Sequence, residues 1–216
     1  MEEFEVRRWG SFREFFLREK KQIAFDMDNA HLISPCDGWL SVCPVEESSS
    51  FFLKGSHYRM EDLIRDPETA GRFHGGQCLI FRLCASDYHH YHFFDDGCVA
   101  KAAYIEGELH SVQPIACETY PVFSRNRRVW NLLETDHFGS VVQTEIGALV
   151  VGGIENRLTC GRFCRGEKKG NFDLSGSTIV LFLEKDCVSL RAELLRQMES
   201  GSEARVSVGM WIGTRK

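Results

Sequence analysis

A glycine–serine step where a polar loop meets an apolar strand could carry out chemistry on its own backbone. Residues 166–184 read GEKKGNFDLSGSTIVLFLE, and the step falls at Gly176 and Ser177. Taken alone, the step is an ordinary turn, because glycine tolerates positive φ and serine favours turns. The Ser177 hydroxyl can also attack the Gly176 carbonyl carbon, which no side chain shields. The resulting ester would eliminate to dehydroalanine, and hydrolysis would leave a pyruvoyl group at a new N-terminus.

This reaction needs a base, because a hydroxyl is a weak nucleophile. Residues 87–92 read DYHHYH and supply His89, His90 and His92. The spacing of His89 and His92 also allows a surface loop or two ligands of a zinc ion, with further ligands from elsewhere. Residues 34–38, SPCDG, add Asp37 in a pattern typical of a turn. A nucleophile, a base and a group that orients the base are the parts of a catalytic triad.

In this order, the three motifs resemble those of the phosphatidylserine decarboxylase family, which read SPxDG, DYHRxH and GST. The resemblance covers nearly the whole chain and is closest to the clostridial forms, including the final IGTRK. Further segments that resemble family motifs in the same order are WGSFREFFLR at 9–18, Lys54-Gly55 with Tyr58, GELHSVQP at 107–114, Asn126-Arg127-Arg128, and Gly147-Ala148 with Val151-Gly152.

The resemblance implies a role for each of four residues. Asp37, His92 and Ser177 match the self-processing triad, in which Asp37 orients His92 and His92 takes the proton from Ser177. His89 matches the histidine assigned to decarboxylation. Cleavage between Gly176 and Ser177 would give chains 1–176 and 177–216, the second beginning with a pyruvoyl cofactor. That group is an electron sink for the decarboxylation of phosphatidylserine to phosphatidylethanolamine.

Three positions near these residues depart from the family pattern. His90 stands where the family has arginine, which puts in doubt any role of that arginine in holding substrate. Lys168 stands where an acidic residue is usual, and this swaps a charge in the loop that leads to the cleavage site. Ser175 precedes Gly176 where many relatives have Gly or Leu. None of the three belongs to the triad.

The elements that must position these residues are mostly strands. Runs rich in Val, Ile and Phe predict strands over 77–83, 98–105, 141–151 and 178–183. Successive strands with few helices between them favour an α+β fold that is β-rich, with antiparallel sheets and a few peripheral helices. Helices are predicted over the first 21 residues, at 59–65 before Pro67, and at 188–199. We expect residues 1–216 to form a single domain.

The first predicted helix carries Phe12, Phe15 and Phe16 on one face, with basic residues around it. Ser11 and Glu14 form a capping box at its start. One interpretation, which we favour, is a helix that docks its phenylalanine face on the core. The other is a membrane-surface helix, with aromatic side chains in the interface and basic residues towards anionic lipid.

Composition bounds the class of protein. Among the 216 residues, 43% are hydrophobic and 26% are charged, which is typical of a folded globular chain. The net charge of −5 argues against a nucleic-acid partner. An odd count of 9 cysteines without a CxxC indicates reduced thiols in a cytosolic protein, and we expect no bound metal.

We therefore expect a cytoplasmic protein, peripherally associated with the cell membrane, because no apolar run approaches the 18 residues of a membrane-spanning helix. The expected partners are phosphatidylserine, the membrane surface and the two cleaved chains, and a homodimer is left open. Two alternative functions also stay open. One is a pyruvoyl-dependent decarboxylase of a soluble amino acid or amine. The other is a non-catalytic β-rich module in which His89, His92 and a cysteine bind zinc.

Overall fold

The computed structural model describes eight stretches of the chain: residues 3–5, 8–46, 50–53, 56–111, 121–148, 153–174, 177–199 and 202–216. Several residues singled out in the sequence lie outside the described ranges. These are Lys54 and Gly55, residues 112–114, Val151 and Gly152, and Ser175 and Gly176.

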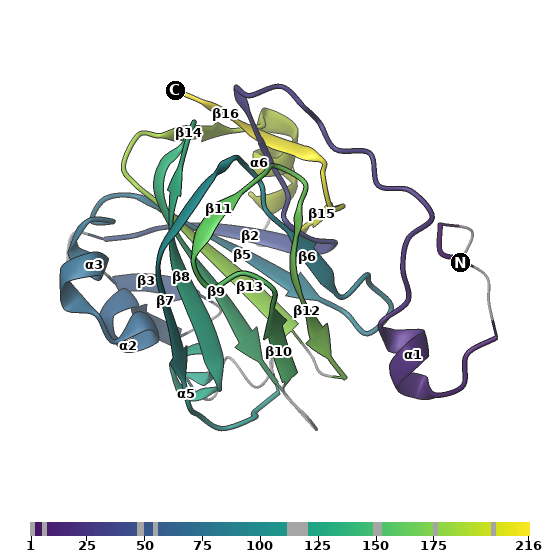
Figure 1. Ribbon diagram of the computed structural model, residues 1–216. Helices are drawn as coiled ribbons and strands as arrows, with labels where there is room; N and C mark the ends of the chain where they lie inside the picture. Colours follow the sequence, from purple (N-terminus) through teal and green to yellow (C-terminus); the bar gives the residue numbers. More distant parts are fainter. Residues whose placement is uncertain are drawn as a thin grey trace.

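An eight-stranded sheet lies at the centre of the molecule, in the order β11-β7-β8-β9-β13-β5-β2-β15 (Figure 1). Its strands are β2 (Gly38–Pro44), β5 (Gln77–Leu83), β7 (Gly97–Ile105), β8 (Arg128–Thr135), β9 (Gly139–Gly147), β11 (Gly161–Phe163), β13 (Ser177–Leu183) and β15 (Ala204–Val206). The strands predicted over 77–83, 98–105 and 178–183 are confirmed to within one residue. The strand predicted over 141–151 begins earlier, at Gly139, and ends at Gly147.

Three smaller sheets complete the fold, and all pairs between the named strands are antiparallel. One joins β1 (His31–Ile33), β16 (Trp211–Arg215) and β14 (Val188–Leu190), and another joins β10 (Gly153–Asn156), β12 (Lys168–Asp173) and β6 (His90–His92). The third is the pair β3 (Ser50–Leu53) and β4 (Ser56–Arg59). The β-rich α+β fold with antiparallel sheets is therefore confirmed.

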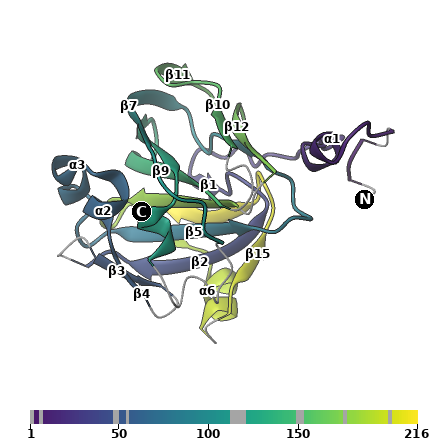
Figure 2. The same cartoon turned by 90° about the horizontal axis from the view of Figure 1, so that it is seen from below.

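The helices of the described residues are short and peripheral: α1 (Phe12–Phe16), α2 (Met60–Ile64), α3 (Pro67–Gly71), α5 (Val122–Arg125) and α6 (Ala192–Met198). In both views α1 and the N-terminal segment lie on one side of the molecule, and α2 and α3 lie on the opposite side (Figures 1 and 2). The helix predicted at 59–65 is confirmed as α2. Its cap residue Arg65 has a φ of 55°, a left-handed conformation that ends the helix.

Two helix predictions need correction. Within the described part of the first 21 residues only α1 is helical, starting after its cap Ser11, whose side chain accepts a hydrogen bond from the Glu14 N–H. The region predicted as a helix at 188–199 begins as strand β14, because Val188 and Leu190 are buried and alternate with exposed Ser189. The helix α6 starts after this strand.

Two large apolar clusters lie on the two faces of the central sheet. Along β13, Ile179 and Leu181 belong to one cluster, and Val180 and Phe182 belong to the other. Tyr91 of β6 and Phe172 of β12 share the first cluster, so the small sheet β10-β12-β6 packs on that face. Figure 2 shows β10, β11 and β12 above the layer formed by β2 and β5. Because strand residues alternate between faces, Ser177 lies on the face that the small sheet covers.

Candidate active site

Ser177 is the first residue of β13 and is completely buried. It pairs with Leu83 of β5 on one side and with Gly147 of β9 on the other. Gly147 is itself held by Asn126 of the segment Asn126-Arg127-Arg128. Asn126 Nδ2 donates to the Gly147 carbonyl at 2.8 Å. The backbone ladders on both sides therefore fix the position of the serine, and Gly147 presents no side chain opposite it.

The chain approaches this position through a strained residue. Leu174, the last described residue before the step, has a φ of 44°, in the left-handed region that costs a residue with a Cβ roughly 1–2 kcal/mol. The preceding Asp173 is anchored, because it accepts a hydrogen bond from Arg13 Nε at 2.8 Å and pairs with Gly153 of β10. Strain between two anchored ends is a feature that clusters at functional sites.

His92 has the protonation state of a base. Its Nδ1 donates to the Gly166 carbonyl at 2.8 Å, since a carbonyl oxygen can only accept. Its Nε2 is buried and has no hydrogen-bond partner among the described residues. Burial lowers the pKa of His92 to about 4, so the ring is neutral at pH 7 and Nε2 carries a lone pair. The His92 N–H also donates to the Pro35 carbonyl at 2.8 Å, which ties this strand to the SPCDG turn.

His89 has the same tautomer in a more enclosed place. Its Nδ1 donates to the Asp87 carbonyl at 3.0 Å, and its buried Nε2 has no partner in the described part of the chain. The Phe16 ring of α1 lies against it, with 3.8 Å between ring centroids, and the residue is completely buried. Desolvation lowers the pKa of His89 to about 4. The site therefore holds two neutral imidazoles, each with a buried Nε2 that no described residue hydrogen-bonds.

Asp37 has a partner that the sequence interpretation missed. Its carboxylate accepts from Lys20 Nζ at 2.7 and 2.9 Å, and its Oδ1 also accepts from the Val208 N–H at 2.9 Å. Within the described residues no hydrogen bond joins Asp37 to His92, whose Nδ1 bonds to the Gly166 carbonyl instead. The turn that contains Asp37 contacts His92 through a backbone hydrogen bond, in which the Pro35 carbonyl accepts from the His92 N–H.

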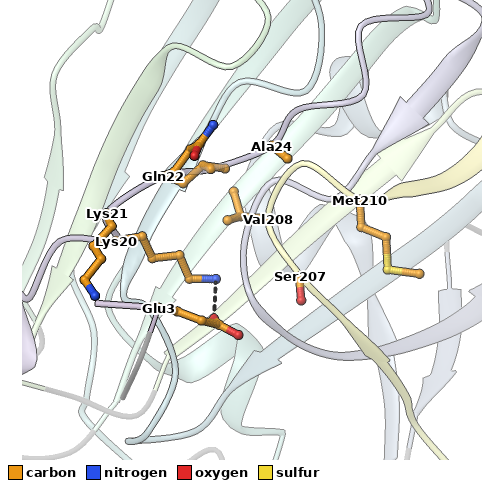
Figure 3. Close-up of a pocket in the computed structure, with 9 residues that line it drawn as sticks. Glu3, Lys20, Lys21, Gln22, Ala24, Ser207, Val208 and Met210 are labelled. Carbon is orange, nitrogen blue, oxygen red and sulfur yellow. Dashed lines mark ion pairs between the residues drawn. The ribbon is translucent and has the colours of Figure 1, made fainter. Parts of the chain in front are cut away.

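A cavity of about 390 Å³ lies beside Lys20. Figure 3 shows Lys20 Nζ directed towards Glu3, with 3.6 Å between Nζ and Oε2. The remaining wall is formed by Lys21, Gln22, Ile23, Ala24, Ser207, Val208 and Met210. Both Lys20 and Asp37 are largely buried, with side-chain exposures of 8% and 6%. The sequence shows that the N-terminal segment is basic, but it does not indicate that Lys20 pairs with Asp37.

Residues 16–20 run across the histidine segment, and each contacts it or the neighbouring Asp37. The contacts, in order, are the Phe16 ring with His89, the Leu17 carbonyl with His90 Nε2, Arg18 with the Ser86 and Asp87 carbonyls, Glu19 with the Tyr88 hydroxyl, and Lys20 with Asp37. This N-terminal strap (residues 16–20) therefore covers His89 and His90, whereas the His92 ring lies beside Phe25 and Tyr88.

Two of the three departures from the family pattern anchor the strap. Lys168 Nζ lies 2.5 Å from Glu19 Oε1, and His90 Nε2 lies 3.7 Å from the same oxygen. These residues therefore meet at one carboxylate. The third departure, Ser175, is outside the described residues.

In the described ranges no group of three or more His, Cys, Asp or Glu side chains is placed to hold a metal ion. Cys160 and Cys164, which are four positions apart in the sequence, are both exposed free thiols. Among the described residues no helix is both long enough and apolar enough to cross a membrane.

Comparison with known proteins identifies the family. A sequence profile described as phosphatidylserine decarboxylase matches residues 9–214. Phosphatidylserine decarboxylase proenzyme 2 of Clostridium acetobutylicum is 37% identical over 215 residues, which are 99% of this chain and 74% of the relative. The proenzymes of Clostridium novyi and Ruminiclostridium cellulolyticum are each 38% identical, over 95% and 98% of this chain and 71% and 72% of their own length. The chain therefore belongs to the phosphatidylserine decarboxylase family.

Proposed function

We propose that this chain is a self-processing, pyruvoyl-dependent phosphatidylserine decarboxylase that folds as one domain over residues 1–216. One observation carries the proposal. The backbone of Ser177 is fixed in the buried sheet beside Leu83 of β5. The segment that follows β5 carries two neutral histidines whose buried Nε2 atoms have no hydrogen-bond partner among the described residues. The names of the similar clostridial proteins, phosphatidylserine decarboxylase proenzymes, agree with this chemistry.

In self-cleavage, His92 Nε2 takes the proton of Ser177 while the serine oxygen attacks the Gly176 carbonyl carbon. The Gly166 carbonyl fixes the tautomer of His92 at Nδ1, the position that a carboxylate occupies in most triads. Asp37 contributes by holding the turn whose Pro35 carbonyl binds the His92 N–H. Elimination and hydrolysis then yield chains 1–176 and 177–216, with ammonia leaving the new N-terminus.

The residues around position 177 fit a pyruvoyl cofactor, since the buried His89 Nε2 has no hydrogen-bond partner in the described part of the chain. When present, this group supplies an electron sink for the loss of CO₂ from a bound amino acid. His89 Nε2 accepts the proton that the substrate amine gives up and returns it to carbon after CO₂ has left. A burial-lowered pKa suits this shuttle, because the ring is neutral before the step.

A phospholipid substrate is favoured over a soluble amine by the surface next to His89. Phe12 of α1 is 68% exposed, and its ring lies 6.3 Å from that of Phe16, which in turn lies against His89. An exposed aromatic at this place suits contact with a bilayer interface. We therefore propose a peripheral membrane enzyme of the cytoplasm.

The test is decarboxylation of phosphatidylserine in mixed vesicles, measured as CO₂ release and phosphatidylethanolamine formation. Wild-type protein should be active, and Ser177→Ala should be inactive. Free serine and simple amines are parallel substrates. Turnover of these alone would replace the lipid assignment with a soluble one, and stoichiometric zinc in an inactive protein would favour the binding module.

A further inference from the structure

A buried ion pair lies between the two sheets of the site. Lys169 of β12 and Glu145 of β9 both have completely buried side chains, and Lys169 Nζ lies 2.7 Å from Glu145 Oε1. Neither residue has a part in the chemistry described above. Apolar residues of matching volume can replace such pairs without loss of stability, so a buried pair calls for an explanation other than stability.

Every donor and acceptor of the pair is satisfied. The three N–H bonds of Lys169 are matched by Glu145, by Asn131 Oδ1 at 2.7 Å and by Asn156 Oδ1 at 3.1 Å. Glu145 also accepts from Gln143 Nε2 at 2.8 Å and from Asn156 Nδ2 at 3.1 Å. Burial lowers the pKa of Lys169, and the carboxylate opposes that effect. The arrangement is therefore a directional network that fixes both strands.

The backbone of β12 is irregular at Lys169. Lys168 pairs with His92 and Gly170 pairs with Tyr91, so Lys169 is the extra residue of a β-bulge opposite the histidine strand β6. Bulges re-aim side chains and are over-represented next to active sites. Here the bulge accompanies a lysine side chain that is buried against the central sheet.

Glu145, the other member of the ion pair, lies on the strand next to the serine strand β13. Glu145 pairs with Ile179 of β13, and Gly147, two residues further along β9, pairs with Ser177. Glu145 and Ser177 therefore project from the same face at neighbouring positions. Lys169 follows Lys168, which pairs with His92. Glu145 lies two residues before Gly147, which pairs with Ser177. The ion pair therefore joins the strand beside His92 to the strand beside Ser177.

Around the network the two sheets also meet through apolar packing, since Phe172 of β12 and Ile179 of β13 belong to the same cluster. Apolar packing is non-directional, so it holds two sheets together without setting their register. Setting the register between packed elements is the best-attested role of buried ionic groups.

We propose that Lys169 and Glu145 are positioning residues that set the histidine-bearing sheet against the serine-bearing sheet. Through this register they fix the approach of His92 and His89 to residue 177, both in self-cleavage and in turnover. The inference rests on the proposed function, because it assumes that these groups react with one another.

The experiment compares Glu145→Gln/Lys169→Met, which removes both charges at similar volume, with wild type. Misplacement of reacting groups by about 1 Å costs roughly 10²-fold. We expect self-cleavage to slow by about 10- to 100-fold and kcat per pyruvoyl group to fall by a similar factor, with KM for the lipid within about twofold of wild type. Counting turnover per pyruvoyl group removes the effect of any chain that failed to fold or to process.

Val142→Ala is the matched control, because Val142 is a buried residue of the same strand on the opposite face. It should lower stability and leave kcat per pyruvoyl group unchanged. Glu145→Asp is the second variant, since it keeps the charge and shortens the reach, and it should lower kcat per pyruvoyl group in a chain that retains the pair. Wild-type kcat in both Glu145 variants, with only stability reduced, would overturn the positioning role. A wild-type chain that never cleaves would instead overturn the proposed function.

Discussion

The serine side and the histidine side of the site are held by different kinds of interaction. Ser177 is placed by backbone ladders to β5 and β9 inside a strand that is buried along its whole length. His89 and His92 are placed by side chains and carbonyls from distant segments, including Phe16 and Gly166. Ser177 is therefore placed by the central sheet itself. His92 also lies in a strand, β6, but the rings of His89 and His92 are oriented by Phe16 and by the Asp87 and Gly166 carbonyls.

This difference has a consequence for mutations. Changes in the apolar faces of the central sheet should act mainly through stability, because they leave the ladder pattern at Ser177 intact. Changes in the strap should act on His89 and His90, which contact the Phe16 ring and the Leu17 carbonyl.

Replacement of the base should give the largest effect. His92→Ala removes the only Nε2 that we assign to deprotonation of Ser177, and self-cleavage should slow by roughly 10²–10⁴-fold, the usual contribution of a general base. The measurement is the time course of chain cleavage followed by intact mass.

Two neighbouring histidines serve as controls for this variant. His90→Gln keeps an N–H that can donate to the Leu17 carbonyl, so cleavage should continue. His89→Ala should also cleave and should lose turnover per pyruvoyl group instead. Cleavage that stops in His89→Ala and continues in His92→Ala would reverse the two assigned roles.

Removal of the strap's buried charge should be next in size. Lys20→Met leaves the Asp37 carboxylate buried without its cation, and removing one partner of a buried pair costs roughly 3–5 kcal/mol. Lys21→Met is the matched control, because Lys21 is exposed and its loss should change the unfolding free energy by less than about 0.5 kcal/mol. Chemical denaturation of both variants in the uncut Ser177→Ala background gives the comparison. Equal stability of the two would show that the strap is held by other contacts.

Acid should destabilise the histidine side in a defined pH window. Burial lowers the pKa of His89 and His92 to about 4, so the unfolded chain binds more protons than the folded chain between pH 6.5 and pH 4. Stability is therefore complete above pH 6.5 and is lost as pH falls towards 4, by at most roughly 3 kcal/mol for each histidine.

The check is the pH dependence of the unfolding free energy in uncut Ser177→Ala, with and without His89→Gln and His92→Gln. The glutamines should flatten the slope across this window while the carboxylates continue to titrate. A slope that the glutamines leave unchanged would assign the acid sensitivity to other groups.

The smallest effect on stability is expected at the outer face of α1. Phe12 is 68% exposed, whereas Phe16 is 4% exposed, so the structure divides the phenylalanine face between surface and core. Phe12→Ala should change stability by less than about 0.5 kcal/mol, and Phe16→Ala should cost roughly 3–5 kcal/mol.

Lipid binding distinguishes the two interpretations of this helix. We expect Phe12→Ala to keep its melting temperature and to sediment less with anionic vesicles at low salt, where basic residues also contribute. A Phe12→Ala protein that is destabilised and binds vesicles normally would contradict the membrane-surface interpretation.

The sequence predicts the serine side better than the histidine side, for a physical reason. Continuous apolar runs such as 77–83 and 178–183 carry their own strand signal, so β5 and β13 agree with the prediction to within one residue. The contacts of Lys20 with Asp37, and of Gly166 with His92, join positions 17 and 74 residues apart. Local pattern contains no information on such pairs, and only the folded chain brings them together.

The helix predicted at 188–199 was wrong at its start because residues 188–190 form strand β14. Residues 188–190 alternate buried and exposed side chains over only three positions, too short a run to distinguish from the start of a helix. Pairing with β16, which lies more than twenty residues away, decides that they form a strand. The sequence also could not predict the bulge at Lys169, because a bulge is defined by the pairing of β12 with β6.

Intact mass of the purified protein is the most direct test of the central claim, that Ser177 reacts with its own backbone. Wild-type protein incubated at neutral pH should convert to a chain of residues 1–176 and a chain of residues 177–216, the latter blocked to N-terminal sequencing by its pyruvoyl group. Ser177→Ala should stay a single chain of 216 residues. A wild-type chain that stays whole, or one that cleaves at another bond, would contradict the account.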